Sequence, residues 1–296
     1  MSTQDTTTPK LIELLDLSGD PEARTDEDIF VGHTPPQSRN RIFGGQVLGQ
    51  AVMAASKTVE QARPIHSMHG YFLRAGDARL PITFGVQRLR DGRSFSARRV
   101  HAYQDGVPIL SMIASFQTYD EGIDHQDTMP EGIPDPESLP STAELIGDIN
   151  HPVAKEYAFN RPFDIRYISE PLFLKGSEDR SAANAVWMKT NSAMPDDDAL
   201  HRAALAFASD YTLLESVLRR HGLAWITPGM SVASLDHAMW WHRPFRVDEW
   251  LLYVQESPSA SGSRGLATGR IFNRAGQLVA TVAQEGMVRL PKDDGE

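Results

Sequence analysis

Residues 69–87, HGYFLRAGDARLPITFGVQ, have a counterpart in residues 237–255, HAMWWHRPFRVDEWLLYVQ, which begin 237 − 69 = 168 positions later. Further along, the dipeptide DG at 105–106, before VPILSMIASF, matches AG at 275–276, before QLVATVAQEG, at an offset of 276 − 106 = 170. Such dipeptides are typical of tight turns between the β-branched strands of a hairpin. The pattern predicts an internal repeat of antiparallel strands.

A helix is expected ahead of each run of strands. Residues 43–59 (FGGQVLGQAVMAASKTV) are rich in Gly and Ala and precede a strand run over 67–118. Residues 200–221 carry apolar side chains at 3.6-residue spacing and precede a second run over 232–289. Signals for the start and end of this second helix flank it, namely Asp196, Asp197 and Asp198 before it, Arg219 and Arg220 in its last turn, and Gly222 after it.

The repeat also predicts the fold class and the division of the chain. One helix with one antiparallel meander does not easily bury both faces of its sheet, whereas two copies side by side give a continuous α+β sheet around two central helices. Residues 119–161 are acidic and Pro-rich, with a short helical candidate over 141–148, and are expected to form a crossover linker. We therefore expect an N-terminal unit over 1–118, this linker, and a C-terminal unit over 162–296.

Composition narrows the function classes. The 296 residues carry a net charge of −10, with a pI near 5.5, which disfavours binding to nucleic acid. The absence of cysteine excludes disulfides, thiolate metal sites and a cysteine nucleophile. The polar N-terminus lacks the pattern of a secretory signal, and no apolar run is long enough for membrane insertion. We therefore expect a soluble cytoplasmic protein.

Several short groups of residues resemble one enzyme family. They are FGGQ and GQA at 43–46 and 49–51, ASD at 208–210, LDHAMWWHRP at 235–244, and QEG at 284–286. In this order and spacing they are similar to the acyl-CoA thioesterase II family, over about 28–289 of the chain. The resemblance implies a double hotdog fold, hydrolysis of acyl-CoA thioesters to free fatty acid and CoA, and no cofactor.

The resemblance further implies a catalytic set. The family's water-activating aspartate, hydroxyl residue and glutamine match Asp210, Ser234 and Gln284. This chain has Ser where the family often has Thr, so the hydroxyl is kept but its rotamer is less fixed. Apolar neighbours are expected to bury Asp210 partly and to raise its pKa. The repeat places the set in the second half alone, because Gln284 falls opposite Ala114 and Ser234 opposite His66.

Residues that contact the substrate are predicted less directly. Gly44 and Gly45, before the first helix, are candidates for a backbone N–H at the developing oxyanion. Met239 and Trp240 are candidates for lining the acyl pocket, although tryptophans in β-rich segments also serve sheet packing. Arg93 is a candidate for binding the CoA phosphates, within a group of arginines that a solvated hairpin equally explains, namely Arg88, Arg90, Arg93, Arg98 and Arg99.

The histidine spacing argues against a metal site. His66 and His69 are three residues apart, and His237 and His242 are five apart. Because odd separations in a strand send side chains to opposite faces, neither pair is suited to chelate a metal. We therefore expect no metal.

Three function classes remain open from the residues. The first is an acyl-CoA thioesterase. The second is a hotdog hydratase or dehydratase that uses Asp236 and His237, although adjacent strand residues face opposite ways. The third is a non-catalytic acyl-CoA-binding sensor, which would not need the three polar positions. The fold alone does not choose among them. Family analogy favours a homo-oligomer, a dimer or a tetramer.

Overall fold

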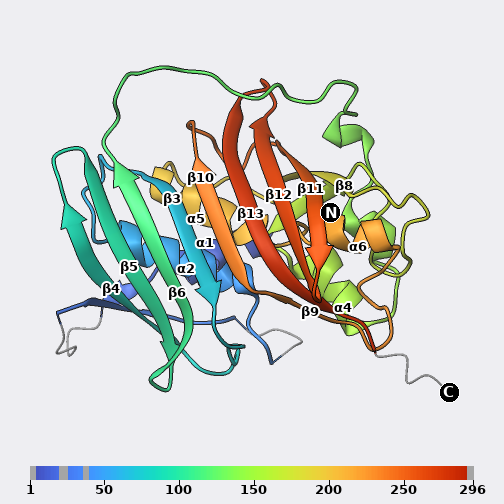
Figure 1. Ribbon diagram of the computed structural model, residues 1–296, viewed down its shortest axis with the longest axis horizontal. Coiled ribbons are helices and arrows are strands. Elements are labelled where there is room, and N and C mark those ends of the chain that lie inside the picture. The colour runs from blue at the N-terminus through green and yellow to red at the C-terminus, as the bar shows by residue number, and fades with distance from the viewer. Residues whose placement is uncertain (1–4, 20–25, 36–39, 292–296) are drawn as a thin grey trace.

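The computed structural model of the protein describes residues 5–19, 26–35 and 40–291, so part of the N-terminal segment considered for a secretory signal lies outside it. A 13-stranded sheet packs on central helices, and Figure 1 shows the sheet in front of them. This is the continuous α+β sheet that the sequence predicts. The first half contains α1 (Thr7–Leu15), β1 (Ser18–Gly19), β2 (Asp28–Gly32), α2 (Gly44–Ser56), β3 (Ile65–Phe72), β4 (Ile82–Asp91), β5 (Phe95–Gln104) and β6 (Val107–Gln117).

The second half repeats this order of elements. A strand precedes the helices, and a meander of long strands follows them. The elements are β7 (Phe163–Tyr167), β8 (Ala183–Thr190), α5 (Asp198–Ser209), α6 (Glu215–His221), β9 (Ser231–Ser234), β10 (Asp236–Trp241), β11 (Leu251–Ser261), β12 (Arg264–Asn273) and β13 (Leu278–Arg289).

The strand order shows the duplication directly. The sheet runs β1-β2-β4-β5-β6-β3-β10-β13-β12-β11-β8-β7, with β9 paired to β13 outside this path. The order β2-β4-β5-β6-β3 is therefore mirrored by β8-β11-β12-β13-β10, and the two halves meet where β3 pairs with β10. In that central pair Ala238 lies opposite His69. The matched sequences thus begin on neighbouring strands.

The predicted hairpin turns are present where the repeat places them. Asp105 and Gly106 both have positive φ, 48° and 74°, and join β5 to β6. Gly276, with φ 79°, lies in the turn between β12 and β13. Positive φ at these positions matches the tight-turn chemistry that DG and AG predict.

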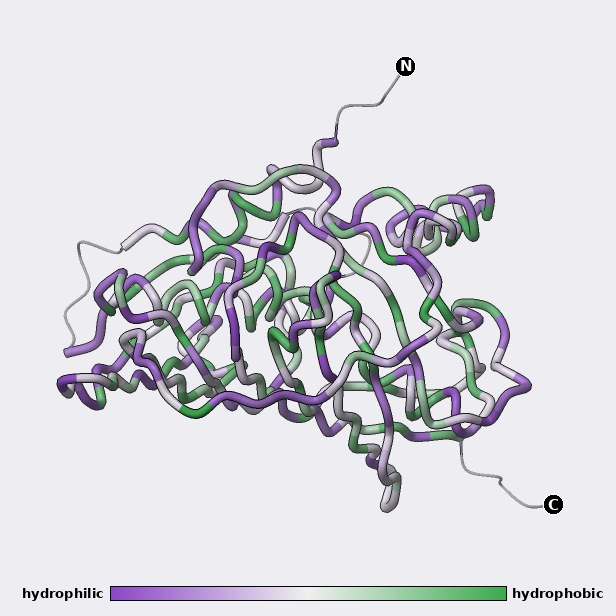
Figure 2. Tube along the Cα trace, turned by 90° about the horizontal axis from the view of Figure 1, so that it is seen from above, coloured by the Kyte–Doolittle hydropathy of each residue, from purple (hydrophilic) through white to green (hydrophobic). Residues whose placement is uncertain are grey.

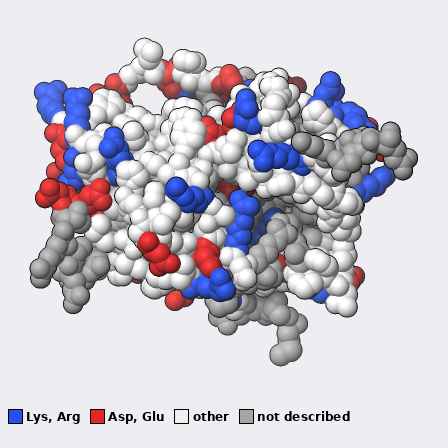
Figure 3. Space-filling view, turned by 60° about the horizontal axis from the view of Figure 1, so that its bottom comes forward, with Lys and Arg blue, Asp and Glu red and all other residues white. Residues whose placement is uncertain are grey.

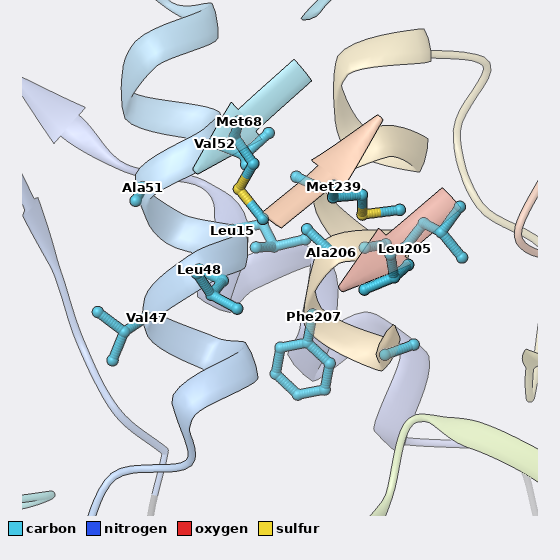
Figure 4. Close-up of a cluster of buried hydrophobic side chains, with 14 of the residues drawn as sticks. Leu15, Val47, Leu48, Ala51, Val52, Met68, Leu205, Ala206, Phe207 and Met239 are labelled. Carbon is cyan, nitrogen blue, oxygen red and sulfur yellow. The ribbon is translucent and has the colours of Figure 1, made fainter. Parts of the chain in front are cut away.

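The helices α2 and α5 cross under the centre of the sheet. A Cβ added to Gly45 would lie 2.2 Å from the carbonyl oxygen of Phe207, so the two backbones approach more closely than any side chain at this position would allow. Figure 4 shows the apolar side chains that fill the space around this crossing, Leu48 and Val52 from α2, Leu205 and Ala206 from α5, and Met68 and Met239 from the sheet.

The second predicted helix is interrupted, and the expectation of one helix over 200–221 was wrong. The helix α5 ends at Ser209, a turn follows, and α6 begins at Glu215. Side chains at the end of α5 and in this turn bond elsewhere: Ser209 contacts His237, and Thr212 accepts a hydrogen bond from Gln255. Such side chains compete with helical hydrogen bonding and favour turns. The predicted caps are confirmed, because the Asp197 side chain caps α5 and Gly222 ends α6 in the left-handed conformation.

The segment 119–161 contains no strand and passes from β6 to the second half over the outer face of the sheet (Figure 1). It holds a 3-10 turn (Pro136–Ser138), α3 (Thr142–Ile146) with a Ser141/Glu144 capping box, α4 (Pro152–Lys155) and a π-helical turn (Glu156–Asn160). Met129, Ile133 and Leu139 pack on Trp187 and Trp250. Trp250 therefore serves sheet packing, as predicted. Figure 2 shows hydrophilic residues along the outer loops. Among the described residues, no helix is long and apolar enough to cross a membrane.

Candidate active site

The turn after α5 holds the carboxylate on which the polar side chains converge. Asp210 is the first residue beyond that helix. Its Oδ1 accepts a hydrogen bond of 2.6 Å from Gln284 Nε2 on β13 and one of 3.2 Å from Ser234 Oγ at the end of β9. Ser234 pairs in the sheet with Gly286, two residues beyond Gln284. The structure therefore brings together the three residues that the sequence singled out.

The N-terminus of α2 contacts the same carboxyl group. The backbone N–H of Gly45 donates a hydrogen bond to Asp210, and a Cβ added to Gly44 would lie 2.8 Å from Asp210 Oδ2. Phe43 caps α2 without a side-chain hydrogen bond. The carboxylate of Asp210 therefore satisfies one of the free N–H groups of this helix end, where the helix dipole favours negative charge. The two predicted glycines thus lie at the site.

Burial governs the protonation of Asp210. The residue keeps some exposed surface, yet its carboxyl group is enclosed by protein atoms, and this desolvation raises its pKa from 3.8 to about 6. Hydrogen bonds from Gln284, then Ser234 and then Gly45 oppose the rise. The apolar surroundings include the ring of Tyr211, which stacks on Phe43 with centroids 4.8 Å apart. Burial thus moves the pKa of this carboxyl group toward neutral pH.

The Gln284 side chain can form one more hydrogen bond. Gln284 is 1% exposed, and its side-chain carbonyl Oε1 has no hydrogen-bond partner among the described residues. A buried polar atom of this kind costs free energy unless it is bonded. Because its amide NH₂ is fixed by Asp210, the carbonyl can accept a hydrogen bond from a small donor such as water.

A pocket of ≈ 70 Å³ opens beside this polar set. Ser234 and Gly44, which both contact Asp210, are part of its wall. The rest of the wall is mostly apolar, and two arginines contribute to it: Ile42, Val47, Phe72, Ala75, Gly76, Ile109, Arg41 and Arg74. The carboxylate therefore lies next to a small opening rather than sealed in the core.

Three of the predicted substrate-contacting residues lie apart from the carboxylate or from one another. Met239 is fully buried on the helix side of β10, whereas the neighbouring Trp240 is 42% exposed on the other side, so the two cannot line one pocket. Arg93 is exposed in the turn between β4 and β5, at the far end of β5 from Gln104, which bonds to the pocket-side segment at Asp77. Within this chain Arg93 is therefore remote from Asp210.

The other arginines of that group mostly have protein partners. Arg98 is 1% exposed and bonds to Asp91 and to the side chain and backbone of Thr58, while Arg88 pairs with Asp28. The hairpin thus uses these cations for its own structure.

Sequence reasoning missed the arginines of the pocket. Arg41 precedes the FGGQ motif, and Arg74 lies in the repeated stretch, where the overlay places it opposite His242 at the offset of 168. The sequence signal for Arg74 is this difference between the two halves, with an arginine in the first and a histidine in the second. Neither arginine belongs to one of the family-like motifs.

Comparison with known proteins identifies the family. A sequence model described as acyl-CoA thioesterase matches residues 158–287, and one described as acyl-CoA thioesterase N-terminal domain matches residues 32–117. The acyl-CoA thioesterase 2 of Haemophilus influenzae is 38% identical over 285 residues, which cover 94% of this chain and 96% of that protein. The chain belongs to the acyl-CoA thioesterase II family.

Further relatives agree with this thioesterase assignment. Human acyl-coenzyme A thioesterase 8 is 40% identical over 277 residues, covering 90% of this chain and 86% of that protein. The crystal structure of an acyl-CoA thioesterase II from Mycobacterium marinum has a TM-score of 0.75 and 42% identity, covering 97% of this chain and 100% of that one. A hot dog fold protein from Alicyclobacillus acidocaldarius, at TM-score 0.76 and 18% identity, supports the fold alone. The predicted double hotdog fold and enzyme class, a thioester hydrolase, are confirmed.

The pair considered for a hydratase does not act as a unit in this thioesterase. Asp236 contacts His69 at 3.2 Å and accepts a hydrogen bond from the backbone N–H of Glu285. His237 is fully buried on the opposite side, where its Nε2 lies 2.9 Å from Ser209 Oγ, and burial lowers its pKa to about 4. Among the described residues, no cluster of His, Cys, Asp and Glu is suited to hold a metal ion.

Proposed function

We propose that the enzyme hydrolyses acyl-CoA by direct attack of water on the thioester carbonyl, with Asp210 as general base. The observation that carries this proposal is the convergence of Ser234 and Gln284 on one oxygen of a buried carboxylate whose pKa is about 6. A base with such a pKa is largely ionised at pH 7 and still basic enough to take a proton. A non-catalytic sensor has no use for this arrangement.

The reaction divides into two steps with balanced proton transfers. Water adds to the thioester carbon while its proton moves to Asp210, which gives a tetrahedral oxyanion. The C–S bond then breaks, the carbonyl re-forms, and the proton on Asp210 passes to the departing thiolate. The products are a fatty acid and CoA. No covalent intermediate is needed because a thiolate is a good leaving group.

The surrounding groups position the water and favour the developing charge. Gln284 Oε1 can accept a hydrogen bond from the second O–H group of the attacking water, while Nε2 of the same side chain donates to Asp210. The Ser234 hydroxyl, part of the pocket wall, donates to the same carboxylate oxygen as Gln284 and so helps to fix the orientation of Asp210. The N-terminal turn of α2, at Gly44 and Gly45, directs its positive end toward the carboxyl group, and its N–H groups are the candidates for contacting the oxyanion.

The test is hydrolysis of medium- and long-chain acyl-CoAs, with released thiol measured by a disulfide reagent. The chain contains no cysteine, so the protein gives no background. We expect Asp210→Asn and Gln284→Ala to lose activity by roughly 10²–10⁴-fold, the range for removing a positioned base or its orienting partner. Gln277→Ala is the matched control, since this exposed glutamine lies just before β13. Activity that persists in Asp210→Asn would overturn the role of the base, and binding without thiol release by the wild type would support the sensor.

We further propose the division into units over 1–118 and 162–296 and assembly into a homo-oligomer, a dimer or a tetramer. The mirrored strand order around the β3–β10 pair supports the division. Light scattering on the intact chain measures the assembly, and a monomeric mass at micromolar concentration would contradict it.

A further inference from the structure

The pocket beside Asp210 connects the catalytic carboxylate to two arginine side chains. Ser234, which donates to Asp210, lines the pocket together with Arg41 and Arg74. The segments that carry the two arginines are hydrogen-bonded to each other, from the Ile42 N–H to the Gly76 carbonyl at 3.0 Å. The two cations are therefore held on adjoining segments at the same opening.

Neither arginine is neutralised by a carboxylate in the described part of the chain. Arg74 donates to the backbone carbonyl of Pro108 at 2.9 Å, which leaves its charge uncompensated. Asp77 forms a backbone bridge with Arg41, but its carboxylate is bound by Arg79 at distances of 2.5 to 3.2 Å. Most of the other arginines in the described segments pair with a carboxylate, as Arg246 does with Asp196 and Asp248.

Figure 3 shows several basic side chains in the middle of the face that comes forward, with acidic side chains near some of them, in a chain whose net charge is −10. A local positive site on an acidic surface attracts anions from solution. Guanidinium groups bind phosphate oxygens with two parallel hydrogen bonds, which lysine cannot do. Apolar residues of the same pocket wall, such as Ile42 and Phe72, suit an uncharged arm that separates the phosphate from the reacting thioester.

We propose that Arg41 and Arg74 form the phosphate subsite of this enzyme, which binds the phosphate groups at the far end of the pantetheine arm while the thioester lies at Asp210. The inference rests on the proposed function, because it takes the thioester to react at that carboxylate. It names the carrier as one with a phosphorylated pantetheine, which both CoA and acyl-carrier protein contain.

Kinetics with three substrates of equal acyl length test the proposal, namely lauroyl-CoA, lauroyl-acyl-carrier protein and the phosphate-free lauroyl-pantetheine. We expect Arg41→Gln and Arg74→Gln each to raise KM for lauroyl-CoA on the order of tenfold, the effect of losing a charge-assisted contact at an exposed site, with kcat unchanged. Both variants should leave kcat/KM for lauroyl-pantetheine at the wild-type value. Arg220→Gln is the matched control, because this exposed arginine also donates to a backbone carbonyl, that of Arg180.

Each outcome decides the proposal. An effect on lauroyl-CoA alone supports the subsite with CoA as the carrier, and an effect on the carrier protein alone supports it with that carrier. Equal losses with lauroyl-pantetheine, or no change with any substrate, overturn it. Calorimetric binding of free CoA, which needs no turnover, should weaken by the same factor in the two variants. This measurement stays informative if Asp210 proves not to be the base, so the two proposals fail separately.

Discussion

Replacing Asp210 with Asn should inactivate the enzyme and, at neutral pH, stabilise its fold. The buried carboxylate is ionised at pH 7 although burial has raised its pKa from 3.8 to about 6. A folded-state pKa above the unfolded value means that the folded protein binds the proton more tightly. The free energy of unfolding of the wild type therefore falls as pH rises from about 4 to about 6, and stays at the lower value above that pH.

The magnitude follows from the pKa change. A rise from 3.8 to about 6, at about 1.4 kcal/mol per pH unit, corresponds to roughly 3 kcal/mol of destabilisation at pH 7. Asn removes this charge penalty but cannot accept every hydrogen bond, since its NH₂ must face either Gly45 or the donors of Ser234 and Gln284. One such mismatch costs about 1–2 kcal/mol. We expect a net gain of about 1–2 kcal/mol at pH 7 that turns into a loss of about 1 kcal/mol near pH 4, because the charge penalty is small there and the hydrogen-bond mismatch remains.

Urea denaturation of the wild type and Asp210→Asn at several values between pH 4 and pH 7.5 provides the measurement. Other groups that titrate in this range, such as the buried Glu215 with a pKa of about 7, contribute to both proteins and cancel in the difference. The stability difference should change by about 2–3 kcal/mol across the range in favour of the variant at high pH. A difference independent of pH, or one of opposite slope, would refute the assignment of a raised pKa to Asp210.

Three further predictions concern the same site. The wild-type kcat/KM should fall about tenfold per pH unit below pH 6, as the base becomes protonated, and a profile flat to pH 5 would exclude Asp210 as that base. Ser234→Ala should lower kcat by roughly 10- to 100-fold while Ser234→Thr stays within about threefold, because Thr keeps the donor; equal activity of both would show that the hydroxyl is dispensable. Gly45→Ala should lower the free energy of unfolding by about 2–4 kcal/mol, because its Cβ would meet the Phe207 carbonyl at 2.2 Å. Gly122→Ala, with open space around it, should lower it by less than about 0.5 kcal/mol. Similar losses in the two variants would contradict the close helix crossing.

The duplication could be predicted from the sequence because local patterns of residues repeat in the two halves. Matching strand stretches and turn dipeptides recur at nearly constant offset, and hairpins pair neighbouring strands. The interruption after Ser209 could not be predicted in the same way. The apolar spacing continues across it, and the reason for the break is a set of side-chain bonds to distant strands, such as that from Gln255 to Thr212.

The residue types of the site could be predicted from the sequence more readily than their arrangement in space. Asp210, Ser234 and Gln284 were found by resemblance, yet their convergence on one oxygen depends on how α5, β9 and β13 meet. The alternation of side chains along β10 could have separated Met239 from Trp240 at once, because neighbours in a strand face opposite sides. The pocket arginines depend on contacts between residues distant in sequence, which no local pattern reports.

The central claim, that water attacks the thioester directly under the control of Asp210, is tested most directly by single-turnover hydrolysis in ¹⁸O-labelled water with enzyme in excess over lauroyl-CoA. Mass spectrometry then reads the label in the released fatty acid and in the peptide that contains Asp210. Direct attack predicts one ¹⁸O atom in the fatty acid and none in the peptide. An unlabelled fatty acid with ¹⁸O in Asp210 would instead show that the carboxylate attacks the thioester itself, and would contradict the proposed mechanism.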